Sequence, residues 1–374
     1  KHTDFTNWAV KKGVSINGVE PTSFVGRGLG LCATQPVKLN LADGCSEQAR
    51  LAAALAQGTS HLNCWSRTWP SVSDFSTSIP MRWPGYLCEL LPPTAKELLA
   101  TQTKRYQKDW NSVQHLLGDA SREAFSYYWL IANTRSMHWN FASQREQERK
   151  RRHNRKQETR QVLCPFLDYC NHANQGCIVT SDATGFTLTA DRDYEVGEEI
   201  HVCYGRHSND ALLVEYGFIF DENDCQELKL DHLICPRLSE SQRNVLESSG
   251  FLRNYTIDPH ETCHRTSVAL RVLLLPSASA QYYINTGEDL SDNAQVKVNV
   301  QLMQLVRSYL DEARQALRSL GELEPRGRCA GKEKEPEKTV EMEEERRWKE
   351  QRDVLVRRWE QIEALLDHAI ERMK

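Results

Sequence analysis

The segment Pro165–Phe218 constrains this chain more than any other part of its sequence. It contains an Asp-x-x-Asn-His turn, an apolar alternation that ends in Tyr204-Gly205, and a short helical pattern that ends in Tyr216-Gly217. Two tyrosines at the ends of neighbouring elements can direct their hydroxyl groups toward one small volume. Such a pair orients the lone pair of a partner group without adding a charge.

The alternation of Ile200, Val202 and Tyr204 predicts a strand whose buried stripe is closed by Tyr204. Ser208 or Asn209 is placed to cap the short helix that follows. The next glycine along the chain is expected to end that helix.

Asp168, Asn171 and His172 form a second cluster, of a composition found in metal sites and beside hydrolase nucleophiles. A single histidine lacks companion ligands, however, and no serine or cysteine nucleophile motif lies nearby. The chain has 12 cysteines but no Cys-x-x-Cys pair. We therefore expect reduced thiols and no metal site.

Two earlier stretches also carry polar or glycine signals. The run Gly26–Gly30 lets the backbone approach a ligand closely, although taken alone it is more typical of a hairpin turn. The stretch Ser121–Trp139 predicts a helix with Tyr128, Arg135 and Trp139 on one face. An arginine on an apolar face needs a negative or dipolar partner, which is either a neighbouring carboxylate or a bound ligand.

Composition indicates an ordinary globular protein. The chain has 374 residues, 40% of them hydrophobic and 26% charged, which suits two domains. No apolar run is long enough to cross a bilayer, and the first residues lack the pattern of a secretory signal, so we expect a soluble intracellular protein. The formal net charge of −4 gives no global basic field, so we expect no direct nucleic-acid binding. We interpret the charged run 145–160 as a solvated segment; a localisation signal or a nucleic-acid contact is the alternative.

These motifs, in their order along the chain, resemble the SET domain of S-adenosylmethionine-dependent protein lysine methyltransferases. The matching pieces are Arg-Gly-Leu-Gly at 27–30, Asn-Thr-Arg at 133–135, DYCNHA at 168–173 and the two tyrosine-glycine pairs. The resemblance covers most of residues 5–224 and is nearest to the Rubisco large-subunit and ribosomal-protein lysine methyltransferase group. Ala173 departs from the serine or threonine common in that family, which puts one local hydrogen bond in doubt.

The resemblance implies an α+β fold: a SET-domain β-fold with a pseudoknot and a helical insert, followed by a mainly α-helical C-terminal domain. The implied divisions are 1–37 and 161–225 for the two parts of the SET domain, 38–160 for its insert, and 226–374 for the helical domain. That last domain is comparable to the substrate-docking domain of the Rubisco group, or else is a cap over the SET sheet. Residues 322–345 are rich in Pro, Gly, Lys and Glu and predict a flexible linker.

Apolar periodicity places helices within these divisions. The stretches 51–57 and 89–117 predict helices in the insert, and Pro92-Pro93 suits a helix start. The stretches 298–320 and 345–373 predict two long amphipathic helices in the C-terminal domain.

The resemblance also assigns roles to single residues. The residues that it implies for binding S-adenosylmethionine are Arg27, Gly28, Leu29, Gly30, Arg135, Asp168, Asn171, His172 and Tyr204, with Asp168 in a supporting position. The implied catalytic residues are Tyr204 and Tyr216, and the implied walls of the lysine channel are Tyr216 and Phe218. Such a channel suits the chemistry, because a free lysine amine has a pKa near ~10.4 and must lose its proton before it can accept a methyl group. Aromatic walls and neutral hydroxyl groups favour the neutral amine.

The expected function is therefore S-adenosylmethionine-dependent methylation of a lysine in a non-histone protein, of the ribosomal-protein or translation-factor class. Histone-lysine or protein-histidine methylation by the same fold is an alternative, and a non-catalytic SET-fold binding scaffold is an alternative of another class. We expect a monomer that acts on a protein partner, with no metal and no membrane, in the cytoplasm, the nucleus or both.

Overall fold

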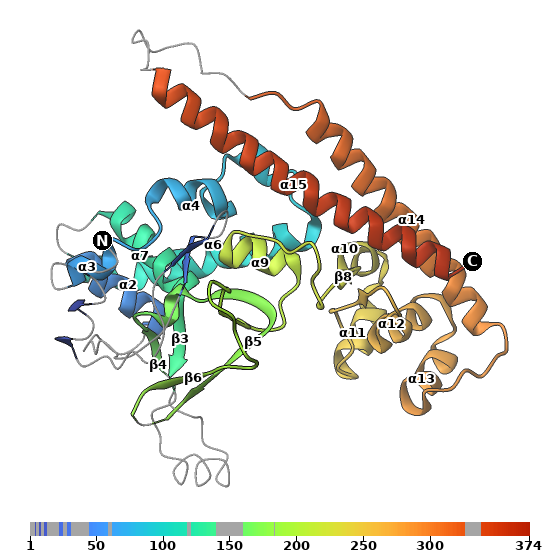
Figure 1. The fold of residues 1–374 in the computed structure, drawn as a ribbon. Helices are drawn as coiled ribbons and strands as arrows, with labels where there is room; N and C mark the ends of the chain where they lie inside the picture. The colour runs from blue at the N-terminus through green and yellow to red at the C-terminus, as the bar shows by residue number, and fades with distance from the viewer. Residues whose placement is uncertain are drawn as a thin grey trace. The chain divides into compact units, whose positions relative to one another are not determined.

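The computed structural model describes residues 4, 7–8, 11–12, 22–24, 28–30, 45–58, 62–117, 121–139, 160–182, 184–325 and 338–374. The chain divides into two compact units (Figure 1). Unit 1 comprises Lys1–Ser76 and Ala100–His207, and unit 2 comprises Thr77–Leu99 and Ser208–Lys374. The predicted division into a SET domain with insert and a separate helical domain stays a prediction.

Unit 1 combines helices with short sheets. Its described elements are β1 (Thr22–Phe24), β2 (Gly28–Gly30), α2 (Glu47–Gln57), α3 (Asn63–Ser66), most of α4 (Val72–Ser78), most of α6 (Pro93–Val113), η3 (Gln114–Leu116), α7 (Arg122–Arg135), β3 (Ser136–Trp139), β4 (Arg160–Leu163), η4 (Leu167–Tyr169), β5 (Asn171–Ser181), β6 (Phe186–Thr189) and β7 (His201–Val202), where η denotes a 3-10 helix.

The helices predicted at 51–57 and 89–117 are confirmed as α2 and α6, and α6 begins at Pro93 as expected. Helix α2 packs against α7. The buried Asp109 carboxylate connects the start of α2 to α7. It accepts hydrogen bonds from the Ser46 hydroxyl, 2.7 Å away, and from the Trp129 indole, 2.9 Å away. Because Ser46 also caps α2 by accepting from the Ala49 N–H, this carboxylate fixes a helix start inside the unit.

The prediction for residues 121–139 is right at its start and wrong at its end. Ser121 caps α7 by accepting a hydrogen bond from the Ala124 N–H, as expected. The helix stops at Arg135, however, and the residues that follow form β3, which pairs antiparallel with β4. Trp139 therefore does not share a helical face with Arg135; its indole donates to the Asp182 carbonyl, 2.7 Å away. Cross-strand pairing overrides the local helical pattern here.

The sheet that carries the site is three-stranded, in the order β6-β5-β7. Strand β5 pairs antiparallel with β6 and parallel with β7, and the register with β7 shifts between His172 and Cys177. An apolar cluster under this sheet holds Cys164, Leu167, Cys170, Cys177 and Val202. The pseudoknot expected for this region stays a prediction.

Unit 2 is mainly helical. Its described elements, besides the ends of α4 and α6, are η2 (Pro80–Arg82), α5 (Gly85–Cys88), α9 (Asn209–Tyr216), β8 (Leu228–Lys229), α10 (Asp231–Ile234), η5 (Cys235–Arg237), α11 (Glu240–Ser248), β9 (Thr256–Ile257), α12 (His264–Leu274), α13 (Ser277–Thr286), α14 (Ala294–Gly321) and α15 (Lys338–Arg372).

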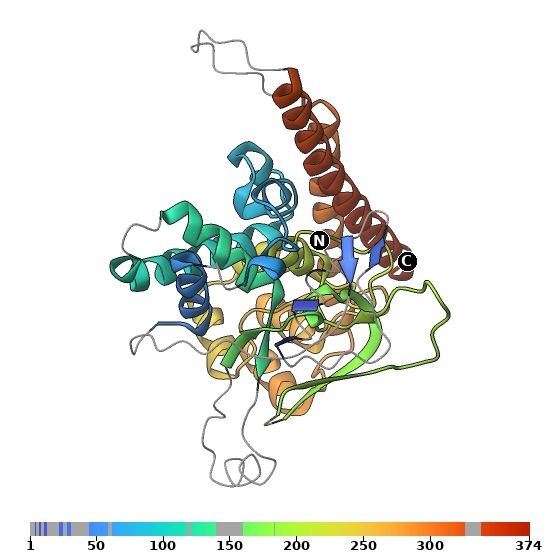
Figure 2. The same ribbon diagram turned by 60° about the vertical axis from the view of Figure 1, so that its left-hand side comes forward.

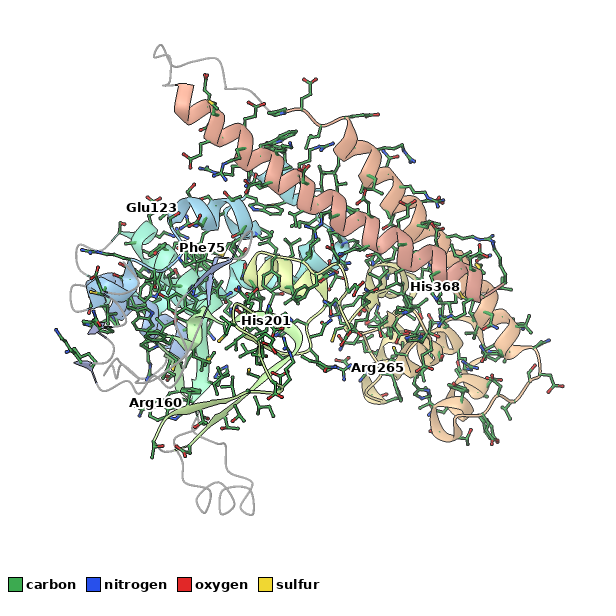
Figure 3. All side chains as sticks on the ribbon, in the orientation of Figure 1. Phe75, Glu123, Arg160, His201, Arg265 and His368 are labelled. Atoms are coloured by element: carbon green, nitrogen blue, oxygen red, sulfur yellow. The ribbon has the colours of Figure 1, made fainter. Side chains whose placement is uncertain are left out.

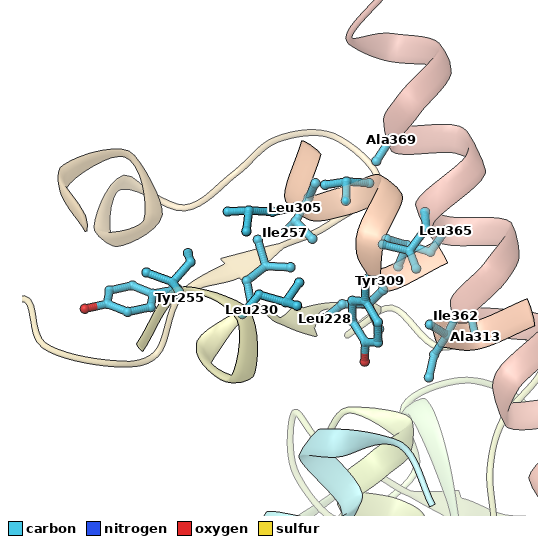
Figure 4. Packing of buried hydrophobic residues seen from close by; sticks show 14 of the residues in the cluster. Leu228, Leu230, Tyr255, Ile257, Leu305, Tyr309, Ala313, Ile362, Leu365 and Ala369 are labelled. Atoms are coloured by element: carbon cyan, nitrogen blue, oxygen red, sulfur yellow. The ribbon is translucent and has the colours of Figure 1, made fainter. Parts of the chain in front are cut away.

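The two long amphipathic helices predicted near the C-terminus are confirmed as α14 and α15, which lie side by side in both views (Figures 1 and 2). Their apolar stripes meet in the core of unit 2, where Tyr309 and Ala313 of α14 lie near Ile362 and Leu365 of α15 (Figure 4). Apolar residues at helical spacing on both partners explain why sequence periodicity found these helices.

The linker predicted at 322–345 is only partly compatible with the structure. Helix α14 ends at Gly321, as the prediction requires, but α15 begins at Lys338, so the last part of the predicted linker is helical. Residues 326–337 lie outside the described residues, as do residues 145–159 of the charged run.

Candidate functional site

The Asp168 turn begins with an unusual backbone conformation. Phe166 is fully buried and has φ 71° and ψ −46°, a region that residues with a side chain rarely adopt. The turn continues into η4, and the Asp168 N–H bonds to the Cys164 carbonyl at 3.1 Å. Backbone strain of this kind persists only where the surrounding packing fixes it, so the position of the Asp168 side chain is closely determined.

Asp168 is a buried carboxylate with two partners from other elements. The Trp65 indole donates to Oδ2 over 3.0 Å, and Arg135 Nη1 lies 3.8 Å from the same oxygen. Burial raises the pKa of Asp168 to about 6, and the Arg135 charge and the Trp65 hydrogen bond oppose that rise without cancelling it. The loss of hydration therefore outweighs the stabilisation that the partners provide.

Arg135 is held at the end of α7 by the same turn. Its Nη1 donates to the Asp168 backbone carbonyl over 2.6 Å. Asp168 thus supplies the neighbouring-carboxylate alternative that the sequence left open. Within the part of the chain that the structure describes, Arg135 Nε and Asp168 Oδ1 are buried without a hydrogen-bond partner. Arg135 therefore retains a donor that its contact with Asp168 does not use.

The glycine-rich stretch lies beside this turn. Gly28, Leu29 and Gly30 form β2, which pairs antiparallel with β1 and lies against η4. The hairpin that the sequence indicated is thus present as a strand pair. Arg27 falls outside the described residues.

Asn171 opens β5, and its side chain is bound by a residue that the sequence analysis did not single out. The Asn171 amide donates to Glu199 Oε1 over 2.6 Å, while Glu199 Oε2 lies 3.3 Å from His201 Nε2 (Figure 3 labels His201). The partly buried Glu199 therefore orients the Asn171 amide.

His172 and Tyr204 are in direct contact. Their rings stack with centroids 5.1 Å apart at 24°, and the Tyr204 N–H donates to His172 Nδ1 over 3.1 Å. This hydrogen bond requires an unprotonated Nδ1. Burial lowers the pKa of His172, against a hydrogen bond with the Val202 backbone that raises it, so the neutral ring that the contact needs is also the favoured form.

The Tyr204 hydroxyl is fixed as well, because it donates to the Cys170 carbonyl over 2.7 Å. With its proton committed, the phenol oxygen acts as an acceptor toward any further group. Ile200, Val202 and Tyr204 all pack on the apolar cluster under the sheet, as their alternation predicted. The strand itself is shorter than expected, because β7 ends at Val202.

One glycine makes the β5–β7 pairing possible. A Cβ at Gly176 would lie 2.5 Å from the His201 carbonyl oxygen and 2.8 Å from its carbon. The two backbones approach this closely only because position 176 has no side chain.

Tyr216 and Phe218 belong to unit 2. Tyr216 is the last residue of α9, which begins after Ser208 and ends at Gly217 in a left-handed conformation with φ 85°. Both ends agree with the sequence prediction, although the Ser208 side chain makes no capping hydrogen bond. The Tyr216 and Phe218 rings lie 6.3 Å apart, so the structure brings these two predicted residues together.

Sequence reasoning missed Trp65, Glu199 and the Cys170 carbonyl. Trp65 is buried in the core, with 1% exposure, and its indole N–H bonds to Asp168 across 103 positions of sequence. Glu199 carries a detectable signal, because it shares the outer face of the Ile200–Val202 alternation with His201. A carbonyl leaves no trace in a sequence.

Two searches were confined to the residues that the structure describes. No group of three or more His, Cys, Asp or Glu side chains among them could hold a metal ion. No helix among them is long and apolar enough to cross a membrane.

Curated relatives match parts of the chain. The ribosomal lysine N-methyltransferase set11 of Schizosaccharomyces pombe is 26% identical over 229 residues, which are 61% of this chain and 54% of that protein. The SET domain-containing protein 4 of Mus musculus is 26% identical over 302 residues, 70% of this chain and 64% of that protein. The actin-histidine N-methyltransferase of Danio rerio is 31% identical over 140 residues, 35% of this chain and 22% of that protein. The chain thus spans little more than half the length of set11, and no family model matches it.

Solved structures match the whole chain in fold. The structure of Rubisco LSMT bound to AdoMet aligns with a TM-score of 0.57 and 15% identity over 100% of this chain and 93% of that one. A structure of Rubisco LSMT bound to sinefungin and monomethyllysine aligns with a TM-score of 0.55 and 17% identity over 100% and 91%. The expected α+β fold with a helical C-terminal region is confirmed. In sequence the chain is similar to a ribosomal lysine N-methyltransferase, and in fold it is similar to the SET-domain protein Rubisco LSMT, so the expected resemblance to this group is confirmed.

Proposed function

We propose that this chain transfers methyl groups from S-adenosylmethionine to the ε-amine of a lysine in a non-histone protein, of the ribosomal-protein or translation-factor class. Similarity to a ribosomal lysine N-methyltransferase and a fold shared with an AdoMet-bound methyltransferase support this function. The observation that carries it is the fixed Tyr204 hydroxyl, held by the Cys170 carbonyl and stacked on His172. We propose the cytoplasm, the nucleus or both as its compartment.

The residues present fit the cofactor. Buried, unpartnered Arg135 Nε is a donor suited to a carboxylate, and the amino-acid part of S-adenosylmethionine carries one. We propose that Arg135, the Asn171 amide and His172 hold the cofactor together with Arg27–Gly30, and that Asp168 acts behind them by positioning Arg135. When bound, the cofactor supplies an electrophilic methyl group.

The acceptor lysine depends on a neutral amine with an aligned lone pair. Tyr204 suits this role because its committed proton leaves the oxygen as a neutral acceptor, which orients an amine N–H without stabilising an ammonium ion as a carboxylate would. We propose that Tyr216 acts likewise and that Phe218 excludes water from the lysine.

A second candidate function is methyl transfer to a protein histidine. It is favoured by the 31% identity to an actin-histidine N-methyltransferase over 140 residues. Lysine remains the proposed acceptor, because the neutral Tyr204 hydroxyl group suits an amine with an aligned lone pair.

The test is transfer of label from methyl-labelled S-adenosylmethionine to proteins of a cell lysate. We expect Tyr204→Phe to lower the initial rate by at least about tenfold, because a hydroxyl that acts in the transition state is lost. Tyr194→Phe is a matched control, since Tyr194 packs on the same apolar cluster but bonds to Asp191. The proposal fails if the wild type labels no protein, or if Tyr204→Phe labels at the wild-type rate.

A further inference from the structure

A row of aromatic rings follows the end of α9. Phe218 lies between its two neighbours, with its ring 6.3 Å from Tyr216 and 5.7 Å from Phe220. Phe220 is fixed by the start of the same helix: the Asn209 side chain accepts from the Phe220 N–H at 3.0 Å and donates to the Phe220 carbonyl at 2.7 Å. Residues 209–220 therefore form a closed loop that carries Tyr216 and Phe218.

Helix α15 reaches this closed loop from about 140 positions away in sequence. The Gln361 amide donates to the Phe220 carbonyl over 2.6 Å and accepts from the Asn209 amide over 2.8 Å. Arg358 Nε donates to Asp210 Oδ1 over 2.8 Å, and the two side chains are 6% and 1% exposed. All of these residues belong to unit 2.

Because these contacts are buried, they fix the position of the loop relative to α15. A buried ion pair is geometrically demanding, because each charge is costly without the other, so Asp210 at the start of α9 can occupy one position relative to α15. The Gln361 amide meets both the first residue of the helix and the end of the closed loop. Two points of the loop are thereby fixed to one rigid helix.

We propose that Arg358 and Gln361 of α15 are positioning residues for the methyl acceptor, which hold the closed loop so that Tyr216 and Phe218 are presented in a single geometry. The proposal rests on the lysine methylation proposed above. Neither residue touches a reacting atom; both act through Asn209, Asp210 and Phe220. The C-terminal helix thus serves the reaction as well as the core.

The sharpest variant is Gln361→Leu, which removes a neutral amide from a half-buried position. It also removes the 3.4 Å hydrogen bond from Arg358 Nη1 to Gln361 Oε1, but it keeps both partners of the Arg358–Asp210 pair. Arg314→Gln is its matched control. Arg314 of α14 also binds α15, through Glu363 at 2.7 Å and Asp367 at 3.1 Å, but it is exposed and its bonds do not involve the closed loop.

Hydrogen–deuterium exchange measures the loop without any assay of activity. In Gln361→Leu we expect the amides of residues 217–223 to exchange at least about tenfold faster than in the wild type, because the loop loses the hydrogen bonds of Phe220 and Asn209 with Gln361. Arg314→Gln should leave them unchanged. Wild-type protection of these amides in Gln361→Leu would overturn the proposal.

Steady-state kinetics and calorimetry test the link to the reaction. Gln361→Leu should lower kcat by about tenfold or more, because a small misplacement of the acceptor is costly, while its Kd for S-adenosylmethionine stays within about twofold. An unchanged kcat, or a loss of cofactor affinity as large as the loss of kcat, would overturn a positioning role. A wild type that methylates nothing contradicts the proposed function instead, and the exchange experiment still decides whether α15 holds the loop.

Discussion

Asp168 is a carboxylate whose protonation differs between the folded and unfolded chain within an accessible pH range. Burial raises its pKa from 3.8 to about 6. Between these values the native state keeps a proton that the unfolded state has released. The free energy of unfolding therefore falls as pH rises through this window. Above the window Asp168 is ionised in both states, and the free energy of unfolding falls no further on its account.

Asp168→Asn removes this titration. From about pH 4 to about pH 7, the wild type should lose on the order of 3 kcal/mol of unfolding free energy relative to the variant. Urea unfolding of both proteins at several pH values measures the difference.

Asp182→Asn is the control, because hydrogen bonds led by the one from the Thr184 hydroxyl lower the pKa of the exposed Asp182. The stabilisation that ionised Asp182 provides is present above its ordinary pKa of 3.8 and is lost only as pH falls below that value. The difference in unfolding free energy between Asp182→Asn and the wild type should therefore not change from about pH 4 to about pH 7. If the difference in unfolding free energy between the wild type and Asp168→Asn is also independent of pH, then the pKa of Asp168 is not raised by burial.

Among the elements, the β5–β7 pair depends most on a single position. Strand β7 ends two residues before Tyr204, and its partner β5 begins at Asn171. Any change that separates the two strands therefore displaces the Tyr204 hydroxyl from the Asn171–His172 segment. At Gly176 the His201 backbone leaves no room for a side chain.

Gly176→Ala should lower the free energy of unfolding by about 1–3 kcal/mol, because its Cβ would overlap the His201 backbone, which cannot yield as a flexible side chain would. Methyl transfer should fall together with stability. Thermal unfolding and initial rates are the measurements.

Gly85→Ala provides the control, since a Cβ there meets nothing within 4 Å. A Gly176→Ala protein as stable as this control would show that the strands are farther apart than the structure places them.

The elements also show how far sequence reasoning reaches. Apolar periodicity and cap chemistry predict helix α14 and the Gly217 end of α9 to within a few residues. They also predict α15, although this helix begins at Lys338, before the predicted start at 345. The end of α7 does not, because the pairing of Met137 with Val162 is a relation between distant segments.

In the whole molecule, local patterns are predictable from the sequence, whereas contacts between distant segments are seen only in the structure. The types and order of the site residues are readable from the motifs. Their partners lie far away along the chain: Trp65 bonds to Asp168 across 103 positions, and Asn209 bonds to Gln361 across 152. No local pattern encodes such pairings, since each depends on how separate elements pack.

The central claim concerns the residue that receives the methyl group. Wild-type protein should be incubated with methyl-labelled S-adenosylmethionine and a lysate, and the labelled protein band should then be hydrolysed and its amino acids identified by mass spectrometry. The account predicts label on the ε-nitrogen of lysine, with little label when Tyr204→Phe replaces the wild type. Label on histidine, or on no protein residue at all, would contradict it.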